Sequence, residues 1–310
     1  MPISGPSSNI SITQAEINEE KFQLSKRLIQ AVIDSVVIVI LFIIYAFVFY
    51  LDKPKIRYFT CDQSDIFFPY KDDTVPYWSV ALYGTLGPLI FLILIELSNA
   101  KLLPYQKNPR FLSGHERRRK FFVCLFHGTS LFILGMSINV LLTDIGKKWI
   151  GRLRPHFMDV CAPDFKNIDC TIEAKTGYVY RPINTGPPFC TGNPKLIEEA
   201  RLSFPSGHAS FSSYTMVFLI VYVEARLFLL KFRYIKPLIQ VAAFIAAYVT
   251  STSRISDYHH RGSDVIGGAL LGTTIALAIT YLVGRVLWDY EVEKPYADFD
   301  LKPRETSRQS

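Results

Sequence analysis

Long apolar blocks separated by charged loops constrain the fold of this chain more than any other feature of its sequence. Of its residues, 49% are hydrophobic and only 20% are charged, and the apolar residues are concentrated in these blocks. A helix that crosses a bilayer needs about 20 predominantly apolar residues, and blocks of this length recur along the chain. The pattern predicts an all-α membrane protein with six transmembrane helices. The expected spans are Leu28–Tyr50, Trp78–Ser98, Phe121–Leu142, Ala209–Leu230, Pro237–Thr252 and Val265–Leu287.

The distribution of charge predicts the orientation of these spans. The loops over 99–120 and 231–236 carry clusters of lysine and arginine, whereas the first loop on the opposite side, 51–77, carries five aspartates. Because positively charged loops stay in the cytosol, both termini are expected there. The net charge of +7 fits these loops, and no basic stripe with interleaved aromatics indicates nucleic-acid binding. The expected regions are a cytosolic tail over 1–27, a six-span membrane domain over 28–287 that would hold any catalytic site, and a cytosolic tail over 288–310.

The connection between the third and fourth spans, 143–207, is far longer than packing requires, and long ordered loops are usually functional. Cysteines on this extracytosolic side would lie in an oxidising compartment, where disulfides form. Four cysteines allow three pairings, which the sequence leaves open. The extracytosolic cysteines are Cys61, Cys161, Cys170 and Cys190, while Cys124 lies within the third span.

Two extracytosolic segments carry groups suited to binding a phosphate. Lys147 and Arg154 are seven residues apart, so a helix that continues the third span and stops at Pro155 would present both on one face. Two fixed cations suit a phosphate, which arginine can contact through two nitrogens. The second segment, 206–208, begins the fourth span, where free backbone N–H groups and the helix dipole favour an anion. Gly207 would let a ligand approach the backbone closely.

A third segment and His208 supply the predicted chemistry. His260 and Asp264 have the spacing of a histidine oriented by a carboxylate, which leaves the other ring nitrogen free to attack. His208 would protonate the departing alkoxide and later activate water. These roles predict a two-step displacement through a phosphohistidine. His259 is interpreted as a supporting or surface residue. No carboxylate cluster of the metal-binding type is present in these loops, so neither a metal nor another cofactor is expected.

The motifs Lys147-x6-Arg154-Pro155, Pro205-Ser206-Gly207-His208 and Ser253-Arg254-x5-His260-x3-Asp264 together resemble the three-part signature of the type 2 phosphatidic-acid phosphatases. The six-span layout and the residues over 151–157 are similar to the animal lipid phosphate phosphatases within that superfamily. The resemblance covers roughly residues 28–287. It implies a nucleophile at His260, a general acid/base at His208 and an orienting Asp264. It implies phosphate contacts from Lys147, Arg154, Ser206, Gly207 and Arg254.

The resemblance also implies a function. Such enzymes act without Mg2+ on phosphatidate, lysophosphatidate, sphingosine 1-phosphate and ceramide 1-phosphate, at the extracellular or lumenal face. The expected partners are lipid phosphates in the membrane, and the resemblance also allows a homo-oligomer. The plasma membrane is the expected location. Two alternatives stay open. One is a phosphotransferase that hands the phosphate to an acceptor other than water, and the other is a non-catalytic membrane scaffold.

Three residues within the spans are interpreted structurally. Gly268 and Gly272 in the sixth span have the spacing of a close helix contact. Glu96 lies near the cytosolic end of its span and is interpreted as interfacial.

Overall fold

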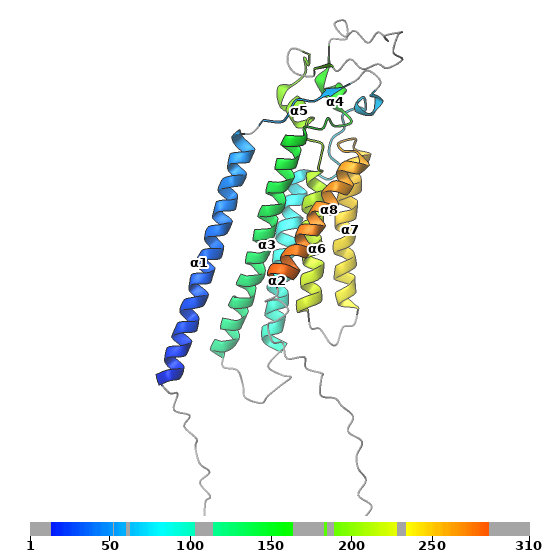
Figure 1. Ribbon diagram of the computed structural model, residues 1–310. Helices are drawn as coiled ribbons and strands as arrows, with labels where there is room; N and C mark the ends of the chain where they lie inside the picture. Colours follow the sequence, from blue (N-terminus) through cyan, green and yellow to red (C-terminus); the bar gives the residue numbers. More distant parts are fainter. Residues whose placement is uncertain are drawn as a thin grey trace, which may run out of the picture.

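The computed structural model describes residues 14–51, 53–59, 63–102, 114–163, 183–184, 189–227 and 234–284. Long helices stand side by side, and short elements form a cap over one end of them (Figure 1). The long helices are α1 (Gln14–Leu51), α2 (Tyr77–Leu102), α3 (Gly114–Ile150), α6 (Gly207–Arg226), α7 (Ile235–Ser256) and α8 (Gly262–Ala278), which a π-helical turn (Ile279–Val283) continues. The short elements are β1 (Tyr58–Phe59), a 3-10 turn (Ser64–Ile66), α4 (Phe157–Cys161), β2 (Ile183–Asn184) and α5 (Pro194–Glu199).

Five helices in the described part of the chain are long and apolar enough to cross a membrane. They correspond to the first, second, third, fifth and sixth predicted spans. The predicted fourth span coincides largely with α6, which is not among the five, and its last residues, 228–230, lie outside the described residues. The count of six spans therefore stays a prediction. The five apolar stretches are Ile29–Tyr50, Tyr77–Ala100, Arg117–Ile150, Ile235–Ser256 and Gly262–Val283.

The central position of α6 explains why it is less apolar than its neighbours. It contacts α2, α3, α7 and α8, and most of its side chains are buried. Its hydroxyl groups find partners inside the bundle: Ser210 Oγ donates to Asn139 Oδ1 (2.8 Å) and the Tyr214 hydroxyl donates to the Phe132 carbonyl (2.7 Å). A helix surrounded by protein needs no apolar face toward lipid, provided that its polar groups are paired.

Two glycines let α8 lie directly against α6, as the sequence predicts. A Cβ atom at Gly268 would lie 2.4 Å from the Ser206 carbonyl oxygen, and one at Gly272 would lie 2.1 Å from the Ser210 carbonyl oxygen. Any side chain at either position would force the helix axes apart. The close contact holds the first turns of α6 and α8 together, and both turns carry residues of the predicted motifs.

The interpretation of Glu96 as interfacial is wrong. Its side chain is 2% exposed and lies between α2 and α6. Its carboxylate accepts hydrogen bonds from Arg226 Nη2 (2.8 Å) and Nε (2.9 Å) and from the Tyr222 hydroxyl (2.8 Å). Sequence position near the end of a span did not reveal this pair because the partner lies 130 residues away. Because a buried charge is tolerated only with its partner, the pair joins the two helices.

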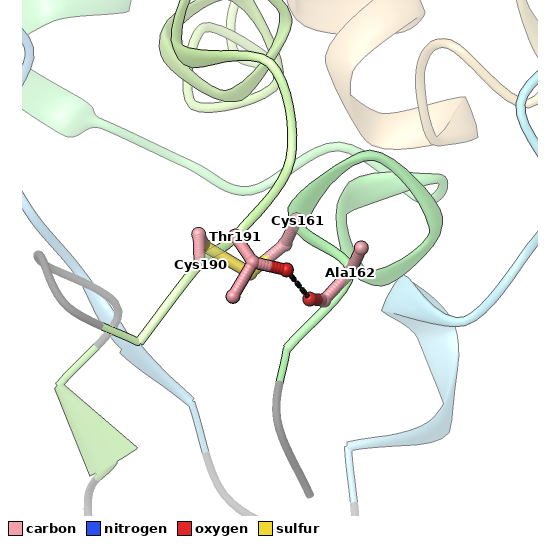
Figure 2. The surroundings of a disulfide bond; sticks show 4 residues. All are labelled: Cys161, Ala162, Cys190 and Thr191. Carbon is pink, nitrogen blue, oxygen red and sulfur yellow. Dashed lines mark hydrogen bonds between the residues drawn. A yellow bond between two sulfur atoms is a disulfide. The ribbon is translucent and has the colours of Figure 1, made fainter.

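A small apolar core and a disulfide hold together the described part of the cap. β1 and β2 pair antiparallel, and Phe59, Leu153 and Phe157 belong to the apolar core of the cap. Cys161 and Cys190 form a disulfide with a Cα–Cα distance of 4.6 Å (Figure 2). This assigns one of the pairings that the sequence left open.

The remaining cysteines divide into two groups. The other two predicted extracytosolic cysteines, Cys61 and Cys170, lie outside the described residues. Cys124 is a free thiol in α3, as its position within a predicted span requires.

Candidate active site

The three segments singled out in the sequence meet at the capped end of the helices (Figure 1). The backbone N–H of Ser206 donates to the Asp264 carbonyl (3.0 Å), which ties the segment before α6 to the first turn of α8. Arg154 Nη1 lies 3.2 Å from His259 Nδ1, which ties the segment after α3 to the connection between α7 and α8. Parts of the chain that are far apart in sequence therefore enclose one site.

The first segment reaches the site by a route different from the predicted one. α3 ends at Ile150, and Gly151 follows with a φ of 57°, so the helix does not continue to Pro155. Gly151 fits this left-handed conformation, and a Cβ there would lie 2.1 Å from the Lys55 carbonyl oxygen. Arg154 consequently stands on an irregular segment instead of on the face of α3 that carries Lys147.

The two neighbouring lysines at the end of α3 have different surroundings. Lys147 Nζ lies beside Gly207, where an added Cβ would be 2.9 Å from it, and 3.8 Å from the Asp144 carboxylate. Lys148 Nζ donates instead to the carbonyl groups of Val48 and Phe49 at the end of α1, both at 2.7 Å. Only Lys147 therefore points its charge at the first turn of α6.

Arg154 is held on one side and unpaired on the other. Its Nη1 donates to Glu199 Oε1 (3.1 Å) and to His259 Nδ1 (3.2 Å). Its Nε is buried and has no hydrogen-bond partner, and its Nη2 makes no hydrogen bond with a described residue. The Nε and Nη2 edge of a guanidinium matches two oxygens of a phosphate.

His259 is buried, which contradicts the interpretation as a surface residue and leaves the supporting role as a prediction. Its side chain is 7% exposed. Its Nδ1 accepts from Arg154, so its Nε2 carries the proton and donates to the Lys71 carbonyl (2.9 Å), with Asp73 Oδ1 at 3.2 Å. A ring with both nitrogens occupied in this way orients Arg154 and is not free to attack.

The first turn of α6 presents further unpaired polar atoms. Ser206 is the N-cap residue, and its Oγ is buried without a hydrogen-bond partner; the same holds for His208 Nε2. The Tyr77 ring contacts the His208 ring edge-on, with centroids 5.7 Å apart. Buried polar atoms in proteins are nearly always paired. In the described residues, three of the four unpaired buried side-chain atoms belong to predicted phosphate-site residues, namely Arg154, Ser206 and His208.

His260 is positioned as a nucleophile requires, although not by the predicted partner. Its Nδ1 donates to the Ser203 carbonyl (2.7 Å), which leaves Nε2 without a proton and without a partner among the described residues. A direct contact between Asp264 and the ring was predicted and is wrong. The Asp264 carboxylate accepts from Ser203 Oγ (2.6 Å), Arg152 Nη1 (2.6 Å) and the backbone N–H of Arg261 (3.0 Å). Asp264 caps α8, and the cap turns its carboxylate toward Ser203, so it supports the histidine through that residue.

Arg254 lies at the end of α7 and is 1% exposed. Its Nη1 donates to Asp73 Oδ1 (2.5 Å), its Nη2 donates to Asp257 Oδ2 (2.8 Å), and its Nε donates to Ser253 Oγ (3.2 Å). Its carbonyl accepts from the backbone N–H groups of His259 and His260. Arg254 therefore both contributes charge to the site and fixes the loop that carries His260.

Burial, and then the cations of the site, lower the pKa values of His208 and His260. Burial, with Arg154 and Lys147 nearby, holds the pKa of His260 well below its usual range. Burial and then Arg254 lower the pKa of His208, which precedes the predicted fourth span, to about 3. Without a bound anion both rings are therefore neutral at physiological pH. A bound phosphate dianion would favour the protonated form of a neighbouring histidine.

Sequence reasoning missed the residues that position the predicted ones. Signals existed for Asp73, in the acidic loop over 51–77 that was interpreted through topology alone, and for Arg152, in the stretch over 151–157 beside the first motif, but neither was given a positioning role. Ser203 precedes the second motif by two residues and carries no chemical signal of its own. These positioning residues are Asp73, Arg152, Glu199, Ser203 and Asp257.

Comparisons of the sequence with known proteins identify the family of the chain. The sequence profile described as the PAP2 superfamily matches residues 128–288, which contain all of the predicted site residues. Phospholipid phosphatase 1 of Rattus norvegicus is 34% identical over 226 residues, which cover 72% of this chain and 73% of the relative. Phospholipid phosphatase 2 of Homo sapiens is 31% identical over 260 residues, which cover 84% of each chain. No solved structure is significantly similar to the chain.

Proposed function

The chain belongs to the PAP2 superfamily, as a membrane-embedded lipid phosphatase, and on this premise we propose that it hydrolyses lipid phosphomonoesters through a phosphohistidine at His260. The observation that carries the proposal is the set of unpaired buried atoms on Arg154, Ser206 and His208, in the same site as His260, whose Nε2 has no partner among the described residues. A phosphate placed among them would give each atom a partner and would meet the charges of Lys147 and Arg254.

In the first step, Nε2 of His260 attacks phosphorus and the bond from phosphorus to the lipid oxygen breaks. His208, protonated once the dianion is bound, gives its proton to the departing alkoxide. The Ser203 carbonyl accepts a hydrogen bond from the Nδ1–H of His260, which keeps its proton, and so stabilises the positive charge that develops on the ring. Asp264 holds Ser203 through its hydroxyl group.

In the second step, His208 removes a proton from water, which attacks phosphorus and breaks the bond to His260. Inorganic phosphate leaves, and both histidines return to their starting states. The negative charge on the equatorial oxygens is met by fixed cations and by the backbone N–H groups of the first turn of α6. Because the chain itself supplies this positive charge, we propose that the reaction does not need Mg2+.

Aromatic residues support a substrate that is held in a membrane. Tyr77, Trp78 and Trp149 lie at the capped ends of α2 and α3, and Trp78 and Trp149 are 69% and 72% exposed. Tryptophan and tyrosine gather at the level of lipid headgroups. Lys147 precedes Trp149 by two residues, so the phosphate site lies at the same level. We therefore propose phosphatidate, lysophosphatidate, sphingosine 1-phosphate and ceramide 1-phosphate as substrates, on the extracellular or lumenal side.

The purified full-length protein is expected to release inorganic phosphate from these four lipids in mixed micelles with EDTA present. His208→Asn should lower the rate by about 10²- to 10⁴-fold, because general acid–base catalysis contributes about that much. Phosphate release is measured colorimetrically, together with labelled products from a 32P-labelled lipid. Label transferred to an added alcohol in place of water would indicate the phosphotransferase, and full dependence on added Mg2+ would contradict the proposed mechanism.

The pH profile of kcat/KM is expected to keep its acidic limb well below pH 6.5, the approximate pKa of a free histidine. Protonation of His260 would engage the Nε2 lone pair that attacks phosphorus. Because the pKa of His260 is lowered, the ring stays neutral as the pH falls through 6.5. Activity should decline only as the pH approaches the lowered pKa. An alkaline limb in kcat should report His208 losing its proton in the complex. Rates are measured between about pH 4 and 9 and corrected for the second ionisation of the substrate near pH 6. An acidic limb at or above 6.5 after this correction would refute the assignment.

A further inference from the structure

The residues over 68–74, called here the 68–74 segment, dock onto the site just before α2 begins. The backbone N–H of Tyr70 donates to Asp159 Oδ2 (2.8 Å) in α4. Thr74 donates to Asp257 through both its backbone N–H (2.8 Å) and its Oγ1 (2.6 Å). The segment is thus fixed to α4, which follows Arg154 in the chain, and to the end of α7, which carries Arg254.

Asp73 lies within this segment, and its contacts lead to two arginines of the site, Arg254 and Arg154. Its Oδ1 accepts from Arg254 Nη1 (2.5 Å) and lies 3.2 Å from His259 Nε2. The same imidazole N–H donates to the Lys71 carbonyl (2.9 Å). The opposite nitrogen of that ring accepts from Arg154 Nη1. One carboxylate therefore touches Arg254 directly and Arg154 through one intervening ring.

The charges of Asp73 and Arg254 indicate that this contact does more than hold a loop in place. Arg254 is almost fully buried and has two carboxylate partners, Asp73 and Asp257. A buried guanidinium that loses a countercharge must shift toward another one or toward water. Without the Asp73 carboxylate, His259 Nε2 would keep the Lys71 carbonyl as an acceptor but would lose its charged neighbour, so the ring would hold Nδ1 less firmly as the acceptor for Arg154.

We propose that Asp73 is a positioning residue that sets both Arg254 and Arg154 for the phosphate, the first by an ion pair and the second through His259. The inference rests on the proposed function, in which both arginines contact the phosphate. Asp73 lies outside all three sequence motifs and more than 70 residues before the first of them.

The test compares Asp73→Asn with Asp72→Asn in the purified full-length protein. Asp72 is adjacent and makes no hydrogen bond or ion pair with a described residue, so it matches the charge change without the contacts. Orthovanadate is the probe, because it adopts the five-coordinate geometry of phosphoryl transfer. For Asp73→Asn, kcat/KM should fall by about 10- to 100-fold, the loss typical of residues that orient the side chains in direct contact with a ligand. The Kd of vanadate, measured by calorimetry, should rise by a similar factor, whereas Asp72→Asn should leave both within about twofold.

Vanadate affinity separates positioning from a general loss of folded protein. A partly unfolded sample would lower the number of binding sites without changing Kd. The double variant Asp73→Asn/His259→Asn should lose less than the product of the two single losses, because part of the effect of Asp73 passes through His259. Where Asp73→Asn does not fold, His259→Asn carries the test, and its Kd for vanadate should rise through the release of Arg154.

Unchanged or tighter vanadate binding by Asp73→Asn would overturn the inference, as would strictly multiplicative losses in the double variant. A wild type that binds vanadate but releases no phosphate from any lipid would overturn the proposed function instead. The vanadate titrations would then still show whether Asp73 positions the two arginines for an anion.

Discussion

Replacing His260 by Asn is expected to lower phosphate release by about 10⁴-fold or more, the scale on which loss of a nucleophile acts. The variant keeps a polar side chain that can still face the Ser203 carbonyl, but it lacks the nitrogen that attacks phosphorus. Rapid quenching of wild type with a 32P-labelled lipid should trap a labelled protein that is stable in alkali and labile in acid, as phosphohistidine is. The His260→Asn protein should carry no such label.

The adjacent His259→Asn variant is the matched control for this experiment. His259 is buried beside the same arginine and has both ring nitrogens engaged, so it orients Arg154 and cannot attack. We expect a smaller loss, on the order of tenfold, and retention of the acid-labile label. If the label vanished in His259→Asn and survived in His260→Asn, the two assignments would have to be exchanged.

Replacing Gly272 by Val is expected to destabilise the folded protein by about 3 kcal/mol or more, at the upper end of overpacking effects. A Cβ there would lie 2.1 Å from the Ser210 carbonyl oxygen and 2.8 Å from the Tyr214 backbone nitrogen. Both neighbours are backbone atoms of the central helix, so neither can turn away as a side chain would. α8 must move from α6, and the His260 loop moves with it. Thermal unfolding in detergent should show a clearly lower midpoint, and phosphatase activity should fall with it.

Gly87→Ala in α2 is the control for that prediction. A Cβ at Gly87 would meet nothing within 4 Å, and alanine is the better helix former by about 1 kcal/mol. Its midpoint should therefore be unchanged or slightly raised. Equal unfolding midpoints for the Gly272→Val and Gly87→Ala proteins would show that α6 and α8 are not packed as closely as described.

The helices of the membrane domain could be predicted from the sequence where they face lipid. Apolar stretches of bilayer length identify α1, α2, α3, α7 and α8, because lipid demands an apolar surface over the whole span. The central α6 gives a weaker signal, since its neighbours satisfy its hydroxyl groups. The buried pair of Glu96 and Arg226 escaped prediction for the same reason: its stability depends on a partner from another helix.

The sequence determined the chemical inventory of the site, because function there needs particular residue types at short fixed spacings. The two histidines, the three cations and the first turn of α6 all follow from local motifs that resemble a known signature. Only the tertiary structure decided how these groups are held. It replaced the predicted contact between Asp264 and His260 by a link through Ser203, ended α3 at Gly151, and brought Asp73 against Arg254 from 181 residues away. Hydrogen bonds between distant segments depend on where the helices pack, and spacing along the chain carries no information about that packing.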